Sequence, residues 1–344
     1  MVDYSLLKRL PKVDLHCHLS GSVRPATIME IALEEGLEVP SKDMGIFTKN
    51  IQVSGNCQSL KDYLTKFDLP LKVMQKQKHL YRITYELLED LWEQNIKYVE
   101  IRIAPYLHME QGLDFHQILE SVLNAMDRAR KNLGIYSNLI LICMRNHSPE
   151  ISLNIVKEGH KYVGKGVVAI DLAGNEIDFS PELHKEAFQW AGNLGLRKTV
   201  HAGEVGIAEN IITAVKELGA ERIGHGVYAF LKEDVCQFIK DRGIPLEMCI
   251  TSNVQTGAVE GYKAHPIKKY LDRGMKVTIN TDNLTVSDTT LEQEYKKAIE
   301  FLDFNYGDLI RVIQNGIEFS FADEGEKERL KEVINRELES LNLK

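Results

Sequence analysis

Four histidines and one aspartate stand at positions where their side chains could share a metal ion. His16 and His18 are two residues apart, and side chains at that spacing on a strand point to the same face. His201, His225 and Asp282 each follow a short apolar run and precede a turn. A lone histidine is more often structural than metal-binding, and an aspartate here could cap a helix. Their common place at strand ends favours one shared site.

Zinc is the metal that these side chains favour. Imidazole and carboxylate groups both bind zinc, and a catalytic zinc site keeps one position open for water. The strand expected over residues 167–172 has no lysine that carbamylation could turn into a bridge between two metals, which favours one ion. Bound zinc lowers the pKa of its water to about 7 and so supplies hydroxide at neutral pH. Five candidates exceed four ligands, so one histidine should be free to act on that water.

Eight short apolar or β-branched runs recur along the chain, and amphipathic helical stretches separate them. Apolar strands that alternate with helices predict a parallel sheet covered by helices, and eight such units fit a closed (β/α)8 TIM barrel of the α/β class. Catalytic groups of such barrels gather at the carboxyl ends of the strands, where the candidate ligands stand. The expected strands are residues 12–17, 97–104, 138–144, 167–172, 198–202, 222–226, 244–249 and 276–280.

The first two strands are separated by roughly 80 residues, far more than one crossover helix needs. We therefore predict one metal-dependent hydrolase barrel domain over residues 1–344, with a helical insertion at about 41–96 beside the substrate pocket. A stripe at helical spacing in this insertion indicates either core packing or a cover over the barrel mouth. Its members are Leu60, Tyr63, Leu64 and Phe67. From residue 287 onward we expect helices to the end of the chain.

The overall composition limits the classes of partner. The 344 residues carry a formal net charge of −8 and no basic run, which argues against a nucleic-acid partner and for small-molecule chemistry. No apolar stretch approaches the roughly 18 residues of a membrane span, and the N-terminal residues lack the apolar core of a signal peptide. The five cysteines are an odd number without a CxxC pair, which indicates reduced thiols in the cytoplasm.

Taken in order, the motifs resemble those of the adenosine deaminase family of the amidohydrolase superfamily. The resemblance runs from Pro11 to about Tyr295, and HAGE followed by GHG is its specific part. A helical segment from Ser59 to Pro70 also looks like the family's segment beside the nucleoside pocket. The matching motifs are His16-Cys17-His18-Leu19, Asp171-Leu172-Ala173-Gly174, His201-Ala202-Gly203-Glu204, Arg222-Ile223-Gly224-His225-Gly226 and Thr281-Asp282.

The resemblance implies a role for each candidate. It places Glu204 as the proton donor to N1 of a purine and His225 beside the metal-bound water. The backbone of Gly174 would contact N3, and His18 would also border the substrate. The implied ligands of a single zinc ion are His16, His18, His201 and Asp282.

The implied reaction is the hydrolytic deamination of adenosine, and of 2′-deoxyadenosine, to inosine and ammonia. Zinc-bound hydroxide attacks purine C6, and the loss of aromaticity requires a proton at N1. Protonated Glu204 would supply it, an effect worth about 10²–10⁴ in rate. Burial under the bound base would raise the pKa of Glu204 enough to keep that proton. His225 and Asp282 would orient the hydroxide and steer its proton to the leaving amine.

Two positions depart from the family's pattern. Ser20 stands where the family often has an aspartate that reaches the ribose 5′-hydroxyl. Serine is shorter and neutral, so the demand for a free 5′-hydroxyl is relaxed. Asn283 replaces an aspartate that would contact N7. Because N7 is an acceptor, only a protonated carboxyl could donate to it, whereas an amide donates without that condition.

Other functions remain open at this stage. Ser20 is also compatible with another amino-purine substrate: adenine, an N6-substituted purine, or a 5′-modified nucleoside such as aminodeoxyfutalosine. A catalytically silent barrel that binds nucleosides would be expected to lack one of the site residues, and none is missing. A two-metal amidohydrolase acting on cyclic amides would bind about two ions per chain.

Overall fold

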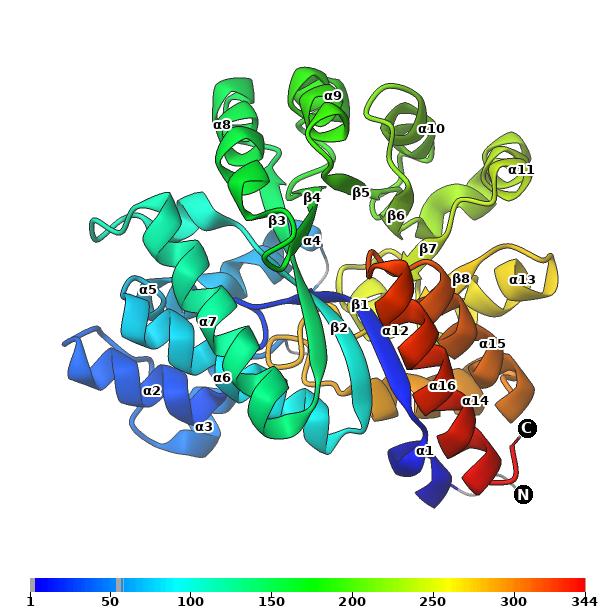
Figure 1. Ribbon diagram of the computed structural model, residues 1–344, viewed down its shortest axis with the longest axis horizontal. Helices are drawn as coiled ribbons and strands as arrows, with labels where there is room; N and C mark the ends of the chain where they lie inside the picture. Colours follow the sequence, from blue (N-terminus) through cyan, green and yellow to red (C-terminus); the bar gives the residue numbers. More distant parts are fainter. Residues whose placement is uncertain (1–3, 54–56, 58, 344) are drawn as a thin grey trace.

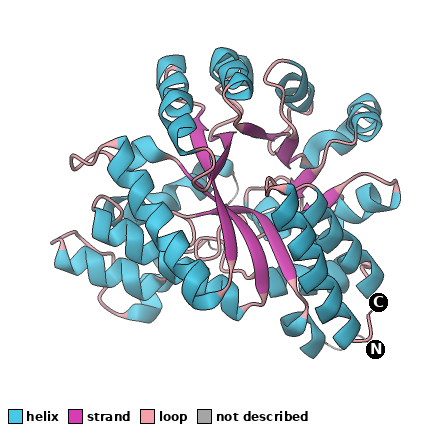
Figure 2. Ribbon diagram, in the orientation of Figure 1, coloured by secondary structure: helices cyan, strands magenta, loops and turns pink. Residues whose placement is uncertain are grey.

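Eight parallel strands form a barrel in the computed structural model, which describes residues 4–53, 57 and 59–343. The strand order follows the sequence, and the helices lie outside the strands (Figures 1 and 2). The strands are β1 (Lys12–His18), β2 (Ile96–Ile103), β3 (Tyr136–Met144), β4 (Val167–Ala173), β5 (Arg197–Ala202), β6 (Arg222–His225), β7 (Leu246–Met248) and β8 (Val277–Ile279). The predicted barrel is therefore confirmed, and each strand lies within two residues of its expected bounds.

Most of the helices follow a strand and cover the outer wall of the barrel. The α-helices are α1 (Ser5–Arg9), α2 (Pro25–Glu34), α3 (Met44–Ile51), α4 (Leu60–Leu64), α5 (Asp68–Val73), α6 (Gln77–Glu93), α7 (Phe115–Leu133), α8 (Pro149–Gly159), α9 (Lys185–Asn193), α10 (Glu209–Lys216), α11 (Glu233–Arg242), α12 (Ile250–Gln255), α13 (Ile267–Asp272), α14 (Leu291–Leu302), α15 (Tyr306–Glu318) and α16 (Glu324–Ser340). The last three confirm the expected helical C-terminal part.

Polar groups close the barrel between its first and last strands. The backbone N–H of His18 donates to the carbonyl of Asp282 at 2.7 Å, and the N–H of Asp282 donates to the carbonyl of His16 at 2.8 Å. The side-chain carbonyl of Asn280 accepts from the N–H of Leu15 at 3.0 Å. Strand β8 itself ends at Ile279, earlier than predicted. Asp282 is thus held against β1 rather than within β8.

Ion pairs between buried side chains fill part of the barrel interior. Arg102 on β2 pairs with Asp171 and with Glu247, each at 2.8 Å, and Arg222 pairs with Glu247 at 2.6 Å and with Glu100. All five side chains are at most 1% exposed. Removing one partner of such a pair leaves an uncompensated buried charge and destabilises a protein by about 3–5 kcal/mol. These pairs therefore tie strands β2, β4, β6 and β7 together beneath the barrel mouth.

Several helices, rather than one crossover helix, connect β1 to β2. Within this connection α4 and the 3-10 helix η1 (Thr65–Phe67) carry the apolar stripe predicted from the sequence. The hydroxyl of Ser59 accepts from the N–H of Asp62 at 3.1 Å and so caps the start of α4. Leu60 and Tyr63 are buried. The stripe faces the cavity described below.

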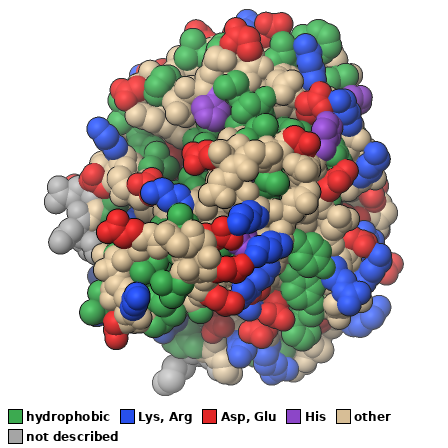
Figure 3. Space-filling model, turned by 90° about the vertical axis from the view of Figure 1, so that its left-hand side faces the viewer, with side chains coloured by type: hydrophobic (Ala, Val, Ile, Leu, Met, Phe, Trp, Pro, Cys, Tyr) green, Lys and Arg blue, Asp and Glu red, His purple; other side chains and the backbone are tan. Residues whose placement is uncertain are grey.

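Charged side chains of both signs are interspersed with apolar ones on the face shown in Figure 3. Helices α2 and α6 lie on this side of the molecule, and ion pairs join them: Arg24, directly before α2, lies 2.6 Å from Asp90, and Arg82 lies 2.8 Å from Glu30. Within the described residues, no helix combines the length and the apolar character that crossing a membrane requires.

Candidate metal centre and substrate pocket

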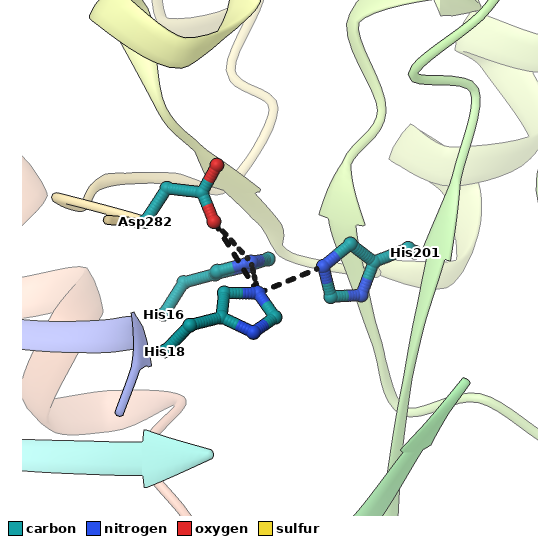
Figure 4. A group of neighbouring side chains, drawn as sticks. All are labelled: His16, His18, His201 and Asp282. Atoms are coloured by element: carbon teal, nitrogen blue, oxygen red, sulfur yellow. Dashed lines mark hydrogen bonds and ion pairs between the residues drawn. The ribbon is translucent and has the colours of Figure 1, made fainter. Parts of the chain in front are cut away.

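Three imidazoles and one carboxylate converge from β1, β5 and the loop after β8 (Figure 4). The Nε2 atoms of His16 and His201 are 3.2 Å from Nε2 of His18. Oδ1 of Asp282 lies 3.4 Å from Nε2 of His16 and 3.3 Å from Nε2 of His18. Four ligand atoms placed tetrahedrally at 2.0–2.1 Å from a zinc ion are about 3.3 Å apart. The spacing of this donor set therefore fits a zinc ion.

Local backbone conformation aims these side chains at one point. His16 and His18 share a face of β1 because side chains alternate along a strand. Asp282 and His225 adopt left-handed φ angles of 60° and 62°, which are uncommon for residues other than glycine. Such conformations persist where the surrounding structure enforces them, and they cluster at functional sites.

Two buried carboxylates orient two of the three imidazole ligands through the ring nitrogen that faces away from the metal site. Nδ1 of His16 lies 2.8 Å from Oε2 of Glu247, and Nδ1 of His201 lies 3.0 Å from Oδ1 of Asp171. A carboxylate at Nδ1 holds the ring proton there and leaves the lone pair of Nε2 for a metal ion. The sequence analysis missed Glu247 and this role of Asp171. The available signal was a carboxylate within an otherwise apolar strand, on β7 and on β4.

His225 stands beside the four ligands with its proton placed by a chain of hydrogen bonds. The N–H of Ile267 donates to Nδ1 of His265 at 3.3 Å, so the proton of His265 lies on Nε2. That Nε2 donates to Oδ1 of Asn253 at 3.1 Å, and Nδ2 of Asn253 donates to Nδ1 of His225 at 3.0 Å. His225 therefore carries its proton on Nε2, which lies 3.8 Å from Oε1 of Glu204. Sequence reasoning found His225 but not Asn253 or His265.

Cys249 gives a second, overlapping group of possible ligands with His225 and Asp282. Burial raises the pKa of the Cys249 thiol well above its usual range, which disfavours the thiolate that binds metals. Burial also lowers the pKa of His225 well below its usual range, so its ring is neutral at pH 7. The set of three histidines and Asp282 is therefore the better metal centre.

Glu204 lies at the same mouth, and the residue is 5% exposed. Burial, followed by the charges of Asp282 and Glu176, raises the pKa of Glu204 well above its usual range. Its backbone is held in place because Glu176 accepts hydrogen bonds from the N–H groups of Gly203 at 2.7 Å and Glu204 at 3.0 Å. Glu204 thus combines a fixed position with a carboxyl that stays protonated where an ordinary glutamate is ionised.

A cavity of about 480 Å³ opens onto the metal centre. This volume lies within the usual range for small-molecule sites, and its walls are mostly apolar. Along one wall, Leu60, Tyr63, Leu64 and Phe67 come from the helices between β1 and β2. From the other strand ends, the wall is completed by Leu107, Ile142, Met144 and Phe179.

The cavity also receives the residues predicted to bind substrate. His18, Ser20, Gly174 and Asn283 all line it, together with Glu204 and His225. Gly174 has a φ angle of 106°, which residues with a side chain rarely adopt, and because it has no side chain it lines the cavity with its backbone. Ser20 is partly buried and Asn283 is buried. The structure therefore brings every predicted site residue except the fully buried His16 to the lining of one cavity, and His16 joins them through the donor set; the contact that each makes with a ligand remains a prediction.

Comparison with known proteins gives long and continuous matches. The sequence profile described as adenosine deaminase matches residues 11–337. A protein named adenosine deaminase from Clostridium kluyveri is 52% identical over 338 residues, which cover 98% of this chain and 96% of that protein. One of the same name from Clostridium acetobutylicum is 49% identical over 315 residues, which cover 92% and 94%. The crystal structure of an adenine deaminase from Arthrobacter aurescens matches with a TM-score of 0.89 at 25% identity, covering 96% of this chain and 99% of that one.

Proposed function

The chain belongs to the adenosine deaminase family of the amidohydrolase superfamily, and on this premise we propose that it hydrolyses adenosine and 2′-deoxyadenosine to inosine and ammonia. We assign it one zinc ion per chain. The observation that carries the proposal is a buried donor set spaced at 3.2–3.4 Å beside a cavity that also contains a buried glutamate, whose pKa burial raises well above its usual range. Relatives named adenosine deaminase at about 50% identity over nearly the full chain support the choice of substrate.

Zinc suits this centre because its ligands are imidazoles and one carboxylate, and carboxylates at Nδ1 hold the rings of His16 and His201. A zinc ion supplies Lewis acidity, which makes water a nucleophile near neutral pH. His16, His18, His201 and Asp282 would hold it.

Polar groups in the cavity would orient the purine. Glu204 would donate to N1, the backbone of Gly174 would contact N3, and the amide of Asn283 would donate to N7. N1 and N7 lie on either side of C6, so contacts at both atoms would direct C6 toward the metal centre. The apolar wall would exclude water from the ring faces, which strengthens these polar contacts.

Three groups would act on the protons of the reaction. Attack at C6 breaks the aromaticity of the ring, and Glu204 would hold the proton that N1 then requires. On the other side, Nε2–H of His225 would donate to the oxygen of the attacking water. The carboxylate of Asp282 would accept a proton from that water. This proton would finally be transferred to the amine, which leaves as ammonia. The roles of Glu204 and His225 agree with the raised pKa of Glu204 and with the ring proton assigned to Nε2 of His225.

A deaminase of another amino-purine is the second candidate. Ser20 presents a neutral hydroxyl to the cavity, which does not demand a free 5′-hydroxyl. The similar structure from Arthrobacter aurescens is of an adenine deaminase. These observations keep adenine and 5′-modified nucleosides as alternative substrates.

Two further points complete the proposal. We assign residues 1–344 to one barrel domain with the helical connection of about residues 41–96 beside its pocket. We also propose a cytoplasmic location, which the five unpaired cysteines support.

A substrate panel tests the proposed reaction. Purified, zinc-loaded protein is mixed with adenosine, 2′-deoxyadenosine and adenine, and ultraviolet change and ammonia release are followed with a chelator-treated control. We expect release from both nucleosides, faster than from adenine, and loss of activity with the chelator. Absence of ammonia from every amino-purine would overturn the proposal, and a clear preference for adenine would favour the second candidate.

A further inference from the structure

The wall of the cavity holds a chain of hydrogen bonds that the proposed reaction does not use. Nδ2 of Asn283 donates to the hydroxyl oxygen of Tyr63 at 2.8 Å. That oxygen lies 2.7 Å from the hydroxyl oxygen of Ser287. All three residues are at most 3% exposed. The chain therefore joins α4, in the helical connection, to the loop that carries Asp282.

The direction of these bonds follows from the groups involved. An amide nitrogen only donates, so the Tyr63 oxygen accepts this bond, and the Tyr63 and Ser287 hydroxyls form a further hydrogen bond in which either oxygen can be the donor. The other end of the amide, Oδ1 of Asn283, has no hydrogen-bond partner among the described residues. It packs against Gly21, where an added Cβ would lie 1.7 Å from Oδ1.

If the Asn283 amide were rotated by 180°, fewer of its polar groups would have a hydrogen-bond partner. It would place two N–H donors against the Cα of Gly21, where the carbonyl now lies. Unpaired buried N–H groups are rarer in proteins than unpaired carbonyl oxygens. The contact with Gly21 and the bond to the Tyr63 hydroxyl therefore both favour the orientation in which Nδ2 of Asn283 faces Tyr63.

We infer that Tyr63 is a positioning residue that sets base specificity, because its hydroxyl holds the Asn283 amide with its second N–H free for N7 of a bound purine. The inference rests on the proposed function for the class of ligand, and it adds a residue that selects among bases. A purine offers an acceptor at N7. A 7-deazapurine has a C–H group there and gains nothing from the oriented amide.

Removing the hydroxyl takes away the acceptor of Nδ2 of Asn283 and so weakens the preference for this orientation of the amide. If the carbonyl oxygen of Asn283 faced N7, two hydrogen-bond acceptors would lie opposite each other. The affinity that a ligand gains from having N7 would then disappear. One hydrogen bond between neutral groups corresponds to about a 3- to 10-fold change in Kd. The wild-type protein should therefore bind inosine about 3- to 10-fold more tightly than 7-deazainosine.

Binding of these two ligands to the full chain provides the test. Calorimetry is performed on the wild type, on Tyr63→Phe and on Tyr85→Phe. Tyr85 is the matched control because its hydroxyl also accepts from an asparagine, Asn132, at 3.1 Å, but it does not line the cavity. We expect Tyr63→Phe to weaken inosine binding to the level of 7-deazainosine and Tyr85→Phe to keep the preference.

A double variant separates positioning from packing. Asn283→Ala should by itself abolish the preference for inosine over 7-deazainosine. Adding Tyr63→Phe should not weaken inosine binding further, because both substitutions act through one contact. If Tyr63 only packs against the ligand, Tyr63→Phe should weaken the binding of both ligands equally. Its effect on the binding free energy should then add to that of Asn283→Ala. Should Tyr63→Phe not fold, Ser287→Ala serves instead, because it removes the neighbouring hydroxyl that holds Tyr63 in place; it should reduce the preference for inosine, which would stay unchanged if Tyr63 only packed.

Ammonia release from adenosine is measured on the same wild-type preparation. A preference for inosine without ammonia release would overturn the proposed deamination and leave the role of Tyr63 standing. Ammonia release with equal affinity for the two ligands would overturn the role of Tyr63 alone. If the protein bound neither inosine nor 7-deazainosine, both the proposed deamination and the role of Tyr63 would be overturned.

Discussion

The two walls of the cavity are built by different means. On the metal side, His16 and His201 stand on barrel strands, and the buried carboxylates Glu247 and Asp171 hold their rings. On the helical side, Leu64 and other apolar side chains come from short helices between β1 and β2, and several are partly exposed. Polar contacts of defined direction dominate the first wall, and apolar packing dominates the second.

This difference follows from what each wall has to hold. Metal ligands must stand within a few tenths of an ångström of their ideal distances, and hydrogen bonds behind them provide that accuracy. An apolar wall contacts a ring and excludes water through a force without direction, so small shifts matter less. We expect changes on the metal side to remove metal or turnover, and changes on the helical side to alter substrate affinity.

Removal of a ligand should have the largest effect. His201→Ala takes away one of four donors, and the remaining three do not complete the site. We expect loss of bound zinc and a decrease in kcat of about 10³-fold or more. Elemental analysis and ammonia release measure the two effects, and a variant with full zinc content would contradict the assigned ligand set.

Glu204→Gln should keep the metal and lose the chemistry. The amide fills the same space but has no acidic proton for N1, so kcat should fall about 10²–10⁴-fold. Zinc content should match that of the wild type. Turnover near the wild-type rate would show that another group protonates the purine.

Asp171→Asn should have an intermediate effect on the metal side. Asparagine can still accept from Nδ1 of His201, but it is a weaker acceptor and no longer balances the charge of Arg102. Loss of such an orienting group typically lowers metal affinity about 10–100-fold. Competition with a chelator measures this affinity, and an unchanged value would mean that the barrel alone orients His201.

Phe67→Ala probes the helical side. The substitution removes apolar contact with the substrate worth about 1 kcal/mol, so KM should rise roughly 5-fold while zinc affinity stays constant. Phe230, which is 47% exposed and does not line the cavity, gives the matched control Phe230→Ala. A loss of zinc in Phe67→Ala would remove the proposed distinction between the walls.

The smallest effect concerns stability and pH. The pKa of Glu204 is raised in the folded protein above its ordinary value of 4.5, so unfolding releases a proton at higher pH. Glu204 therefore destabilises the metal-free protein as pH rises above about 4.5, and has no such effect below it. We expect Glu204→Gln to raise the Tm of metal-free protein by about 1–3 °C at pH 7 and by less at pH 4. An equal shift at both pH values would contradict a raised pKa.

Much of the fold and of the site could be predicted from the sequence, because both have a local signature. Strand runs show as apolar segments, and the spacing of His16 and His18 already places both on one face of β1. The motifs around His201 and His225 end strands where barrels carry their active sites. These features depend only on the few residues around each position.

Protonation and orientation depended on contacts that the sequence does not display. Glu247 lies 231 residues from the His16 ring that it holds, and Tyr63 lies 220 residues from Asn283. Whether such groups meet depends on how the barrel closes and how side chains pack within it. The residue types and their places on strands were determined by the sequence itself. The ring nitrogen that carries each proton, the state of Glu204 and the direction of the Asn283 amide were decided only by the tertiary structure, because burial and hydrogen-bond partners set them.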